Sequence, residues 1–237
     1  MTAPQDSPTL RQWGSFRPKA VLFDMDGVLF DSMPGHATCW EQTFQHFGLS
    51  GTAYDAFLNE GRTAESTINL FAERDWGRKA TTEEIDEIYA YKCKLFNLLP
   101  EASQMAGAQT VLQLVKDSGM KILVVTGSGQ ESLLSRLETN YPGIFRSEWI
   151  VSSKDCERGK PFPDPYLLGL QRGGISAEEA VVVENAPLGV TAAISANIFT
   201  IGVNTGPLPE RLLSEAGAGV VLPDMEALAQ LWRTTFP

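Results

Sequence analysis

Two aspartates, Asp24 and Asp26, carry the strongest chemical signal in the sequence. They follow a short apolar run, residues 20–23, and Gly27 comes directly after them. The apolar run predicts a buried strand, and glycine permits a sharp turn where the strand ends. Because open α/β sheets bind ligands in the crevice beyond the carboxyl ends of their strands, the two carboxylates are expected to converge there. Alone, so short a pattern favours a solvated acidic turn over a site.

A second set of polar residues suits a phosphate group. Thr126 ends another apolar run and is followed by Gly127 and Ser128. A hydroxyl together with main-chain N–H groups at a helix start forms a cradle for phosphate oxygens, although the same residues can simply cap the helix. Lys160 lies in the proline-rich segment 159–164, where a stiff loop can hold it as a fixed positive charge. Taken alone, Lys160 is more typical of a surface lysine.

Glu184 and Asn185 end a further apolar run. Carboxylate and amide oxygens are ligands for hard cations such as Mg²⁺. The same two residues could instead cap the helix that is expected to follow them. The pair therefore indicates a metal site only in combination with the other motifs.

Apolar runs and helical patterns alternate along the chain and indicate the fold. The runs are β-branched and show no polar alternation, which is typical of parallel strands covered on both faces. Strand–helix alternation implies right-handed crossovers and a doubly wound, mostly parallel, Rossmann-like α/β sheet. The expected strands are residues 19–23, 121–125, 148–151, 180–183, 199–203 and 220–222, and the expected helices are 108–118, 130–138, 164–172 and 187–196.

Residues 34–103 break that alternation, because they show helical patterns and no strong strand. The expected helices there are roughly 34–47, 53–58, 64–74 and 82–98. We therefore expect an all-helical cap domain, inserted after the first strand, that lies as a lid over the carboxyl end of the sheet. The α/β catalytic core would comprise residues 18–33 and 104–237. Residues 1–17 are expected to be a flexible N-terminal tail and not a signal peptide.

Composition excludes several classes of function. The chain has 237 residues and a formal net charge of −10 at pH 7, which argues against nucleic acid and anionic membranes as partners. No apolar run is long enough to cross a bilayer. Cys39, Cys93 and Cys156 are odd in number and widely spaced, which favours free thiols in a reducing cytoplasm. We therefore expect a cytoplasmic protein, monomeric by default. If its substrate is a phosphate, the site needs local cations, either side chains or metal, against the negative net charge.

Taken together, the four motifs resemble those of the haloacid dehalogenase superfamily of phosphohydrolases. Within it, the chain resembles the β-phosphoglucomutase-like branch, whose helical cap is inserted after the first motif. The resemblance covers nearly all of residues 19–232. It is especially close to bacterial members with Glu-Gly-Arg-Thr in the cap, here residues 60–63, and Glu-Asn-Ala-Pro in the last motif, here residues 184–187. Some of that subgroup hydrolyse small phosphate compounds, pyrophosphate among them.

The resemblance implies a role for each motif residue. Asp24 would be the nucleophile that forms a phosphoaspartate, and Asp26 would be the general acid and base. Thr126 and Lys160 would hold the transferring phosphoryl oxygens. The ligands of Mg²⁺ would come from Asp24, the main-chain carbonyl of Asp26, Glu184 and Asn185.

The chain departs from the family pattern at Asn185, where an acidic residue is usual. An amide oxygen can bind Mg²⁺ but brings no charge, so the site keeps one fewer negative charge. Glu60 in the cap is either the carboxylate that replaces this charge when the cap closes or an ordinary loop acid. The sequence leaves both interpretations open.

Other cap residues bear on the choice between a hydrolase and a sugar-phosphate mutase. The mutases have an arginine at a position that corresponds to Ala64, whereas Arg62 lies earlier in this chain. His36 matches a cap-hinge histidine of the mutases, but a lone histidine at a helix start can also be structural. Lys92 and Lys94 could add positive charge at the cap edge, although lysines on a helix are more often solvated.

We therefore expect a Mg²⁺-dependent phosphohydrolase that acts on a small phosphate ester or anhydride, with pyrophosphate as one candidate. The alternative is a β-phosphoglucomutase-type sugar-phosphate mutase. A third interpretation is a non-enzymatic binding protein that retains the fold, and the intact set of motif residues argues against it. Dehalogenation is disfavoured, since those relatives lack the second aspartate of the first motif.

Overall fold

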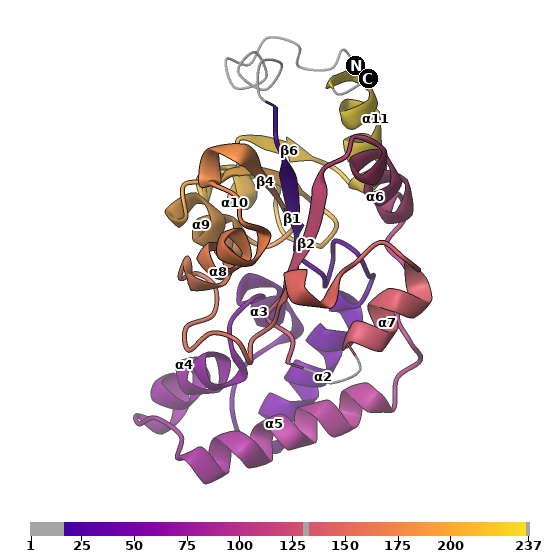
Figure 1. The fold of residues 1–237 in the computed structure, drawn as a ribbon. Helices are drawn as coiled ribbons and strands as arrows, with labels where there is room; N and C mark the ends of the chain where they lie inside the picture. Colours follow the sequence, from indigo (N-terminus) through magenta and orange to yellow (C-terminus); the bar gives the residue numbers. More distant parts are fainter. Residues whose placement is uncertain (1–16, 130–132, 236–237) are drawn as a thin grey trace.

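Six parallel strands form one sheet in the order β3-β2-β1-β4-β5-β6 (Figure 1). A computed structural model describes residues 17–129 and 133–235 of the chain, so the expected tail lies almost entirely outside the described residues. The strands are β1 Ala20–Phe23, β2 Lys121–Val125, β3 Ile150–Val151, β4 Ala180–Glu184, β5 Phe199–Val203 and β6 Val220–Leu222. The predicted fold class is confirmed.

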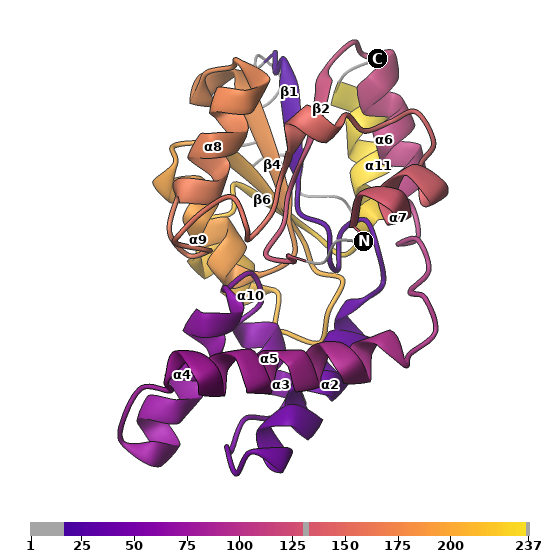
Figure 2. The same ribbon diagram turned by 60° about the horizontal axis from the view of Figure 1, so that its bottom comes forward.

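Helices cover both faces of the sheet (Figures 1 and 2). On one side lie α6 (Ala108–Asp117), α7 (Leu133–Asn140) and α11 (Met225–Thr235), with α6 packed against α11. On the other side lie α8 (Asp164–Gly173), α9 (Pro187–Ser195) and the short α10 (Arg211–Glu215). This two-sided cover explains why the strands are apolar throughout.

Alternate residues of β1 enter different hydrophobic cores. Val21 and Phe23 join a buried cluster that contains Trp232 of α11. Leu22 joins a second cluster, which contains Tyr166 of α8. Because successive strand residues point to opposite faces, both sets must be apolar when helices cover both sides.

Four consecutive helices make up the helical insert, residues 33–97, beyond the carboxyl end of β1 (Figure 2). They are α2 (Met33–His46), α3 (Ala53–Leu58), α4 (Ala64–Trp76) and α5 (Thr82–Asn97). Thr52, Thr63 and Thr81 begin α3, α4 and α5, and each hydroxyl accepts a hydrogen bond from the main-chain N–H three residues later. These N-caps satisfy otherwise unpaired helix donors and set where the helices start.

The two linkers between the insert and the sheet pair with each other. The Asp31 N–H donates to the Ser103 carbonyl at 3.0 Å, and the Met105 N–H donates to the Leu29 carbonyl at 2.9 Å. The Gln104 side chain also donates to the Asn140 carbonyl at the end of α7, at 2.5 Å. The entry to the insert and the exit from it therefore form one connected unit.

The predicted elements differ from the observed ones in several places. The predicted strand 148–151 is wrong in its first half, because Ser147–Trp149 forms a 3-10 turn and β3 comprises Ile150–Val151 alone. α10, α11 and two short 3-10 turns, Ser147–Trp149 and Ala177–Glu179, were not expected. The predicted helix 130–138 corresponds to α7, and its first three residues lie outside the described part of the chain. Sequence periodicity missed α10 because five residues are too few to show a helical pattern.

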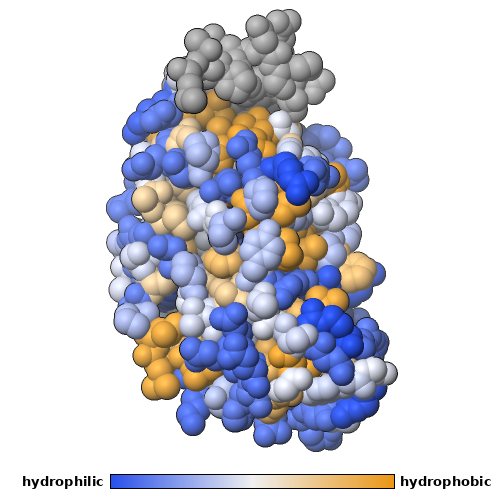
Figure 3. Space-filling model, turned by 180° about the vertical axis from the view of Figure 1, so that it is seen from behind, coloured by the Kyte–Doolittle hydropathy of each residue, from blue (hydrophilic) through white to orange (hydrophobic). Residues whose placement is uncertain are grey.

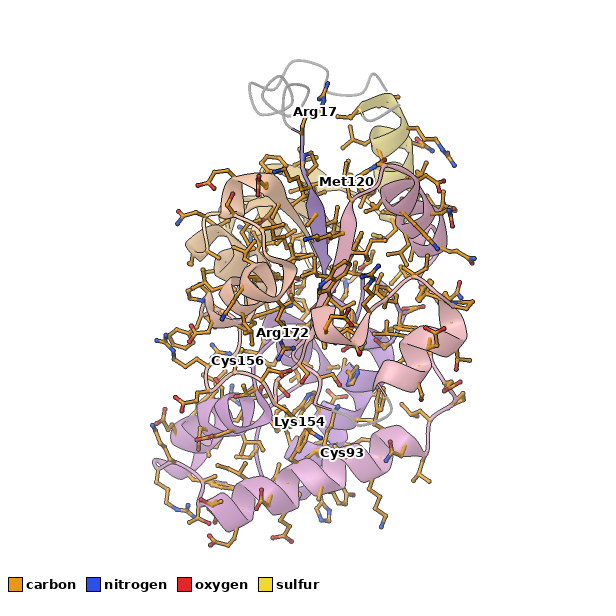
Figure 4. The ribbon with its side chains drawn as sticks, in the orientation of Figure 1. Arg17, Cys93, Met120, Lys154, Cys156 and Arg172 are labelled. Atoms are coloured by element: carbon orange, nitrogen blue, oxygen red, sulfur yellow. The ribbon has the colours of Figure 1, made fainter. Side chains whose placement is uncertain are left out.

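The hydropathy of the helices and the surface, and the state of the cysteines, agree with the composition. None of the helices that the structure describes combines the length and apolar character needed to cross a bilayer. The face in Figure 3 mixes hydrophilic and hydrophobic residues over both the sheet region and the insert. The three cysteines are free thiols, and Cys93 and Cys156 come from different elements, α5 and the loop before α8 (Figure 4).

We expect Leu22→Ala to lower the free energy of unfolding by about 2–5 kcal/mol, because it opens a cavity in the sheet core. Leu22 is 0% exposed, and α8 crosses it so closely that a Cβ on Gly169 would lie 2.9 Å from its Cδ2. Chemical denaturation measures the effect. Leu167→Ala is the control, since Leu167 on the same helix is 49% exposed and should change the stability by less than about 0.5 kcal/mol. Equal losses in the two variants would contradict this account of the core.

Candidate active site

The carboxyl end of β1 lies between the ends of β2 and β4. Phe23 pairs with Val124 of β2 and with Val183 of β4. Asp24 directly follows Phe23, and Glu184 directly follows Val183. Thr126 comes two residues after Val124, so all three lie at the same edge of the sheet. The chain builds β2 and β3 on one side of β1 and then β4 to β6 on the other, so this edge is the topological switch point of the sheet.

Lys160 is the centre of a buried ionic network at this edge. Its ammonium group donates to Asp24 Oδ1, to Glu184 Oε1 at 2.5 Å and to the Val125 carbonyl at 3.1 Å. The residue is only 2% exposed. Burial lowers the pKa of Lys160, but the carboxylates of Asp24 and Glu184 outweigh that effect and hold the pKa above its ordinary value. Lys160 is therefore a buried, paired cation and not the surface lysine that its segment alone suggested, and its expected role on the phosphoryl group stays a prediction.

Glu184 is enclosed by hydrogen-bond donors. Its Oε1 accepts from Lys160 and from the Tyr166 hydroxyl, the latter at 2.8 Å. Its Oε2 accepts the N–H groups of Asn185 at 3.0 Å and Ala186 at 3.1 Å. With 0% exposure, this carboxylate is held rigidly by the protein, and its expected role as a metal ligand stays a prediction.

Lys160 alone does not offset the effects that disfavour the ionised form of Asp24. Burial raises the pKa of Asp24 to about 8, and Glu184 and Asp26 add to the rise, while Lys160 lowers it. Burial also raises the pKa of Glu60 well above its ordinary value, and Asp24 and Glu184 reinforce this. Several carboxylates thus share one lysine, and ionising all of them requires a further cation.

Asp26 has a separate set of partners. Ser32 Oγ donates to Asp26 Oδ1 at 2.5 Å, and His36 Nε2 lies 3.3 Å from the same oxygen. Lys92 Nζ lies 2.7 Å from His36 Nδ1. An ammonium group can only donate, so Nδ1 accepts and the proton on Nε2 points to Asp26. Burial acts to raise the pKa of Asp26, but His36 and Ser32 more than offset it and the pKa is lowered.

The expectation that Lys92 is a solvated helix residue is wrong. Lys92 is 4% exposed and its ammonium group lies 4.8 Å from the ring centroid of Phe96 and 5.6 Å from that of Trp40. Lys94 is exposed as expected. Helix residues two positions apart do not share a face, so α5 buries one lysine and exposes the other.

Glu60 of the insert reaches the motif residue Asn185. Asn185 Nδ2 lies 3.1 Å from both carboxylate oxygens of Glu60. Its Oδ1 is buried and has no hydrogen-bond partner among the described residues. A buried amide oxygen without a partner, next to the Glu60 carboxylate, suits a hard cation, so the residues present fit Mg²⁺.

This candidate metal site is a mixed set of oxygens. Within the described ranges, no group of three or more His, Cys, Asp or Glu side chains could hold a metal ion by itself. The Asn185 amide and the main-chain carbonyl of Asp26 would therefore have to complete the carboxylate ligands. Gly27 makes room for the amide, because a Cβ there would lie 2.1 Å from Asn185 Nδ2.

The loop between α3 and α4 packs directly on the core. Gly61 adopts a φ of 90°, and a Cβ on it would lie 2.7 Å from Lys160 Cδ. A Cβ on Gly127 would lie 3.1 Å from Gly61 Cα, and one on Gly159 would lie 2.9 Å from Thr63 Cγ2. Glycines on both surfaces therefore permit a close approach that side chains would block.

A cavity of about 90 Å³ remains between the insert and the core. It is lined by Asp24, Asp26, Met33, His36, Trp40, Ala56, Asn59, Glu60, Gly61, Arg62, Ala64, Thr67, Tyr89, Lys92, Gly127 and Ser128. Arg62 has neutral partners there, because it donates to Asn59 Oδ1 and to Ser66 Oγ, each at 3.0 Å. The structure thus brings His36, Glu60 and Arg62 of the insert to the motif residues of the core.

The loop at residues 126–128, which is expected to bind phosphate, directs its hydrogen bonds into the protein. Thr126 Oγ1 accepts the Ser128 N–H at 3.0 Å, and the Thr126 N–H donates to the Val151 carbonyl at 2.9 Å. Thr126 is buried, whereas Gly127 and Ser128 line the cavity. Both of these N–H groups are engaged within the protein, and the expected binding of phosphate oxygens by this loop stays a prediction.

Sequence reasoning missed Ser32, Tyr89 and Tyr166. Tyr166 belongs to the buried face of α8, together with Gly169, Leu170 and Gly173. Helical periodicity could have predicted that burial, but not the hydrogen bond from its hydroxyl to Glu184. Ser32 donates to Asp26, six residues earlier, and Tyr89 lines the cavity from α5, but neither residue belongs to a motif that would have singled it out.

Known proteins of similar sequence and structure include phosphatases. The family model for haloacid dehalogenase-like hydrolases matches residues 21–203. Hexitol phosphatase A of Escherichia coli (strain K12) is 32% identical over 192 residues, which cover 79% of this chain and 84% of that protein. A solved structure named "Putative beta-phosphoglucomutase from Bacteroides vulgatus" has a TM-score of 0.91 and 43% identity, with 96% of each chain covered. The "Putative pyrophosphatase PpaX" of Clostridium perfringens (strain 13 / Type A) is 28% identical over 200 residues, 84% of this chain and 89% of that protein.

We expect Gly159→Ala to reduce turnover of phosphate compounds about tenfold, because the added methyl group collides with Thr63 and displaces the insert from the core. Steady-state kinetics measure the loss, and thermal unfolding should change little. Thr63→Ser removes the methyl group nearest to the collision and keeps the hydroxyl that caps α4. The double variant should therefore recover part of the lost activity. Unchanged activity in Gly159→Ala would show that this contact does not matter for turnover.

Proposed function

Because the chain belongs to the haloacid dehalogenase-like hydrolase family, we propose that it is a Mg²⁺-dependent phosphohydrolase that acts on a small phosphate ester or anhydride through a phosphoaspartate. The observation that carries the proposal is the convergence of Asp24, Lys160 and Thr126 at one sheet edge, where Asp24 lines the cavity between the helical insert and the core. A carboxylate, a fixed cation and a phosphate cradle are the parts that phosphoryl transfer needs.

The proposed reaction has two steps. An Asp24 carboxylate oxygen attacks phosphorus and the bond from phosphorus to the leaving oxygen breaks. Asp26, which His36 and Ser32 keep ionised in the free site, must first take up a proton, and it donates that proton to the leaving oxygen. Asp26 then takes a proton from the water that attacks the phosphoaspartate, which releases inorganic phosphate and restores Asp24. Lys160 and the loop from Thr126 to Ser128 hold the transferring phosphoryl oxygens.

The same geometry supports Mg²⁺ as cofactor. Asp24, the Asp26 main-chain carbonyl and Asn185 Oδ1 would hold the ion, with Glu184 and Glu60 beside it. When bound, the ion supplies positive charge that neutralises the phosphoryl oxygens and keeps the carboxylates ionised. His36 and Lys92 orient Asp26 from the insert side.

The position of Glu60 favours a small leaving group. Its carboxylate reaches Asn185 across the gap between the insert and the core, and a second phosphoryl group is more compact than a hexose, so pyrophosphate is the preferred candidate among small substrates. The alternative, a sugar-phosphate mutase, is favoured by the 43% identity to the Bacteroides vulgatus structure and by the contact of His36 with Asp26. Ala64 lines the cavity at the position where the mutases would place an arginine, which favours the hydrolase.

We expect Asp24→Asn to abolish turnover while the protein stays folded, because no other carboxylate in the site is paired with Lys160 in a position open to the cavity. The test is a panel of phosphate compounds that includes pyrophosphate and hexose phosphates, with Mg²⁺ and with excess chelator. Wild-type activity should disappear with chelator, and Ca²⁺ should inhibit, since its larger and looser coordination shell spoils in-line geometry. Near-normal turnover by folded Asp24→Asn, or full wild-type activity in chelator, would refute the proposed mechanism.

We also expect Glu60 to favour small substrates. Glu60 contacts Asn185, so the closed insert brings its carboxylate to the proposed metal site, and a bulky sugar would have to lie between them. Glu60→Ala and Glu60→Asn should therefore lower kcat/KM for pyrophosphate about tenfold and for hexose phosphates less than about threefold.

The matched control for Glu60 is Glu65→Ala, which removes an exposed acid from the first turn of α4. It should leave both values of kcat/KM within about twofold of the wild type. Equal losses on every substrate in the Glu60 variants, or no loss, would make Glu60 an ordinary loop acid.

A further inference from the structure

Tyr166 is a buried residue that the proposed reaction does not use. It lies on α8, is 0% exposed and belongs to the core beneath the sheet. Its hydroxyl donates to Glu184 Oε1 at 2.8 Å, and its ring centroid lies 5.3 Å from Lys160 Nζ. One side chain thus contacts both members of the Lys160–Glu184 pair.

The hydrogen bonds of Lys160 create a problem for substrate binding. An ammonium group has three N–H donors, and those of Lys160 are directed to Asp24, the Val125 carbonyl and Glu184. A phosphoryl oxygen can gain an N–H from Lys160 only if one of these three acceptors gives it up. A buried acceptor that loses its donor without a replacement costs free energy, so the choice depends on which acceptor has another donor.

Glu184 Oε1 is the acceptor that can release Lys160 without being left unpaired. The Val125 carbonyl sits at the end of β2, and Asp24 must stay beside Lys160 to attack the phosphoryl group it holds. Glu184 Oε1 keeps the Tyr166 hydroxyl when Lys160 turns away, and Oε2 keeps two main-chain N–H groups. The carboxylate therefore remains hydrogen-bonded in both arrangements.

We propose that Tyr166 is a positioning residue whose hydroxyl holds Glu184 so that Lys160 can transfer one N–H from Glu184 to a phosphoryl oxygen. The inference rests on the proposed function, because it assigns the binding partner of Lys160 in that reaction. The proton stays on the tyrosine throughout, and burial, with Glu184 and Asp24, raises the pKa of Tyr166 well above its ordinary value. Without the hydroxyl, Glu184 Oε1 would have Lys160 as its remaining side-chain donor and would hold it away from the substrate.

The test compares Tyr166→Phe with the wild type in two measurements that contain Mg²⁺. The first is binding of orthovanadate, a mimic of the transferring phosphoryl group, by isothermal titration. The second is steady-state hydrolysis of pyrophosphate and of the best ester in the panel. Because one charge-assisted hydrogen bond to the phosphoryl group is lost, vanadate affinity and kcat should each fall about tenfold, with KM within about twofold.

Tyr141→Phe is the matched control. Tyr141 is also a fully buried tyrosine, but its hydroxyl donates to the Leu29 carbonyl in the other core. It should show a similar loss of thermal stability and unchanged vanadate affinity. A purely structural role for Tyr166 would give the same result in both variants and would overturn the proposal.

A double variant covers the case in which Tyr166→Phe is too unstable to interpret alone. If Tyr166 acts through Glu184, adding Tyr166→Phe to Glu184→Gln should change vanadate affinity less than about twofold, because the amide no longer holds Lys160 strongly. A full tenfold additional loss would contradict the proposal.

The proposed function is judged separately, on the wild type. If the wild type neither hydrolyses any phosphate compound nor binds vanadate, both the proposed function and the role of Tyr166 are overturned. If the wild type is active and Tyr166→Phe is unaffected, only the role of Tyr166 is overturned.

Discussion

The site depends on one electrostatic constraint, the burial of several carboxylates around a single lysine. Asp24 and Glu184 both bind the Lys160 ammonium group, and burial together with the nearby Asp24 and Glu184 carboxylates raises the pKa of Glu60. Buried charges are costly unless they are paired and hydrogen-bonded. The arrangement is therefore balanced only when more positive charge enters the cavity, which is the property expected of a site that takes up Mg²⁺ and a phosphate group together. The parallel sheet supplies the rigid edge that holds these groups in place.

The same edge separates the two aspartates, although they are neighbours in sequence. Asp24 faces the Lys160 network of the core, and Asp26 faces Ser32 at the linker and His36 in the insert. In the proposed reaction, the nucleophile Asp24 would keep a constant position against the phosphoryl group, whereas Asp26 would act on the leaving group and then on water. Partners from the core for one residue, and from the linker and insert for the other, agree with those proposed roles.

Closure of the insert completes the site from the other side. Backbone-to-backbone packing of the loop at Gly61 on Gly127 lets Glu60 reach Asn185, and it reduces the space for substrate to about 90 Å³. Asn185 stands where an acid is usual, and its side chain contacts the Glu60 carboxylate. The two residues therefore belong together. Under the proposed function, this pair would tie metal binding to the packed position of the insert, and substrate size would then become a condition for activity.

By itself, the sequence determined the sheet, most of the helices and the positions of the motif residues at strand ends, because those depend on local patterns of apolar residues and glycine. It also placed Lys160 and Glu184 in one constellation through family resemblance. Only the tertiary structure showed three side-chain hydrogen bonds: Asn185 with Glu60, Lys92 with His36, and Tyr166 with Glu184. These pairs join residues that are 125, 56 and 18 positions apart, respectively. Their partners are set by how the insert and α8 pack against the sheet, and no local pattern in the chain specifies that packing.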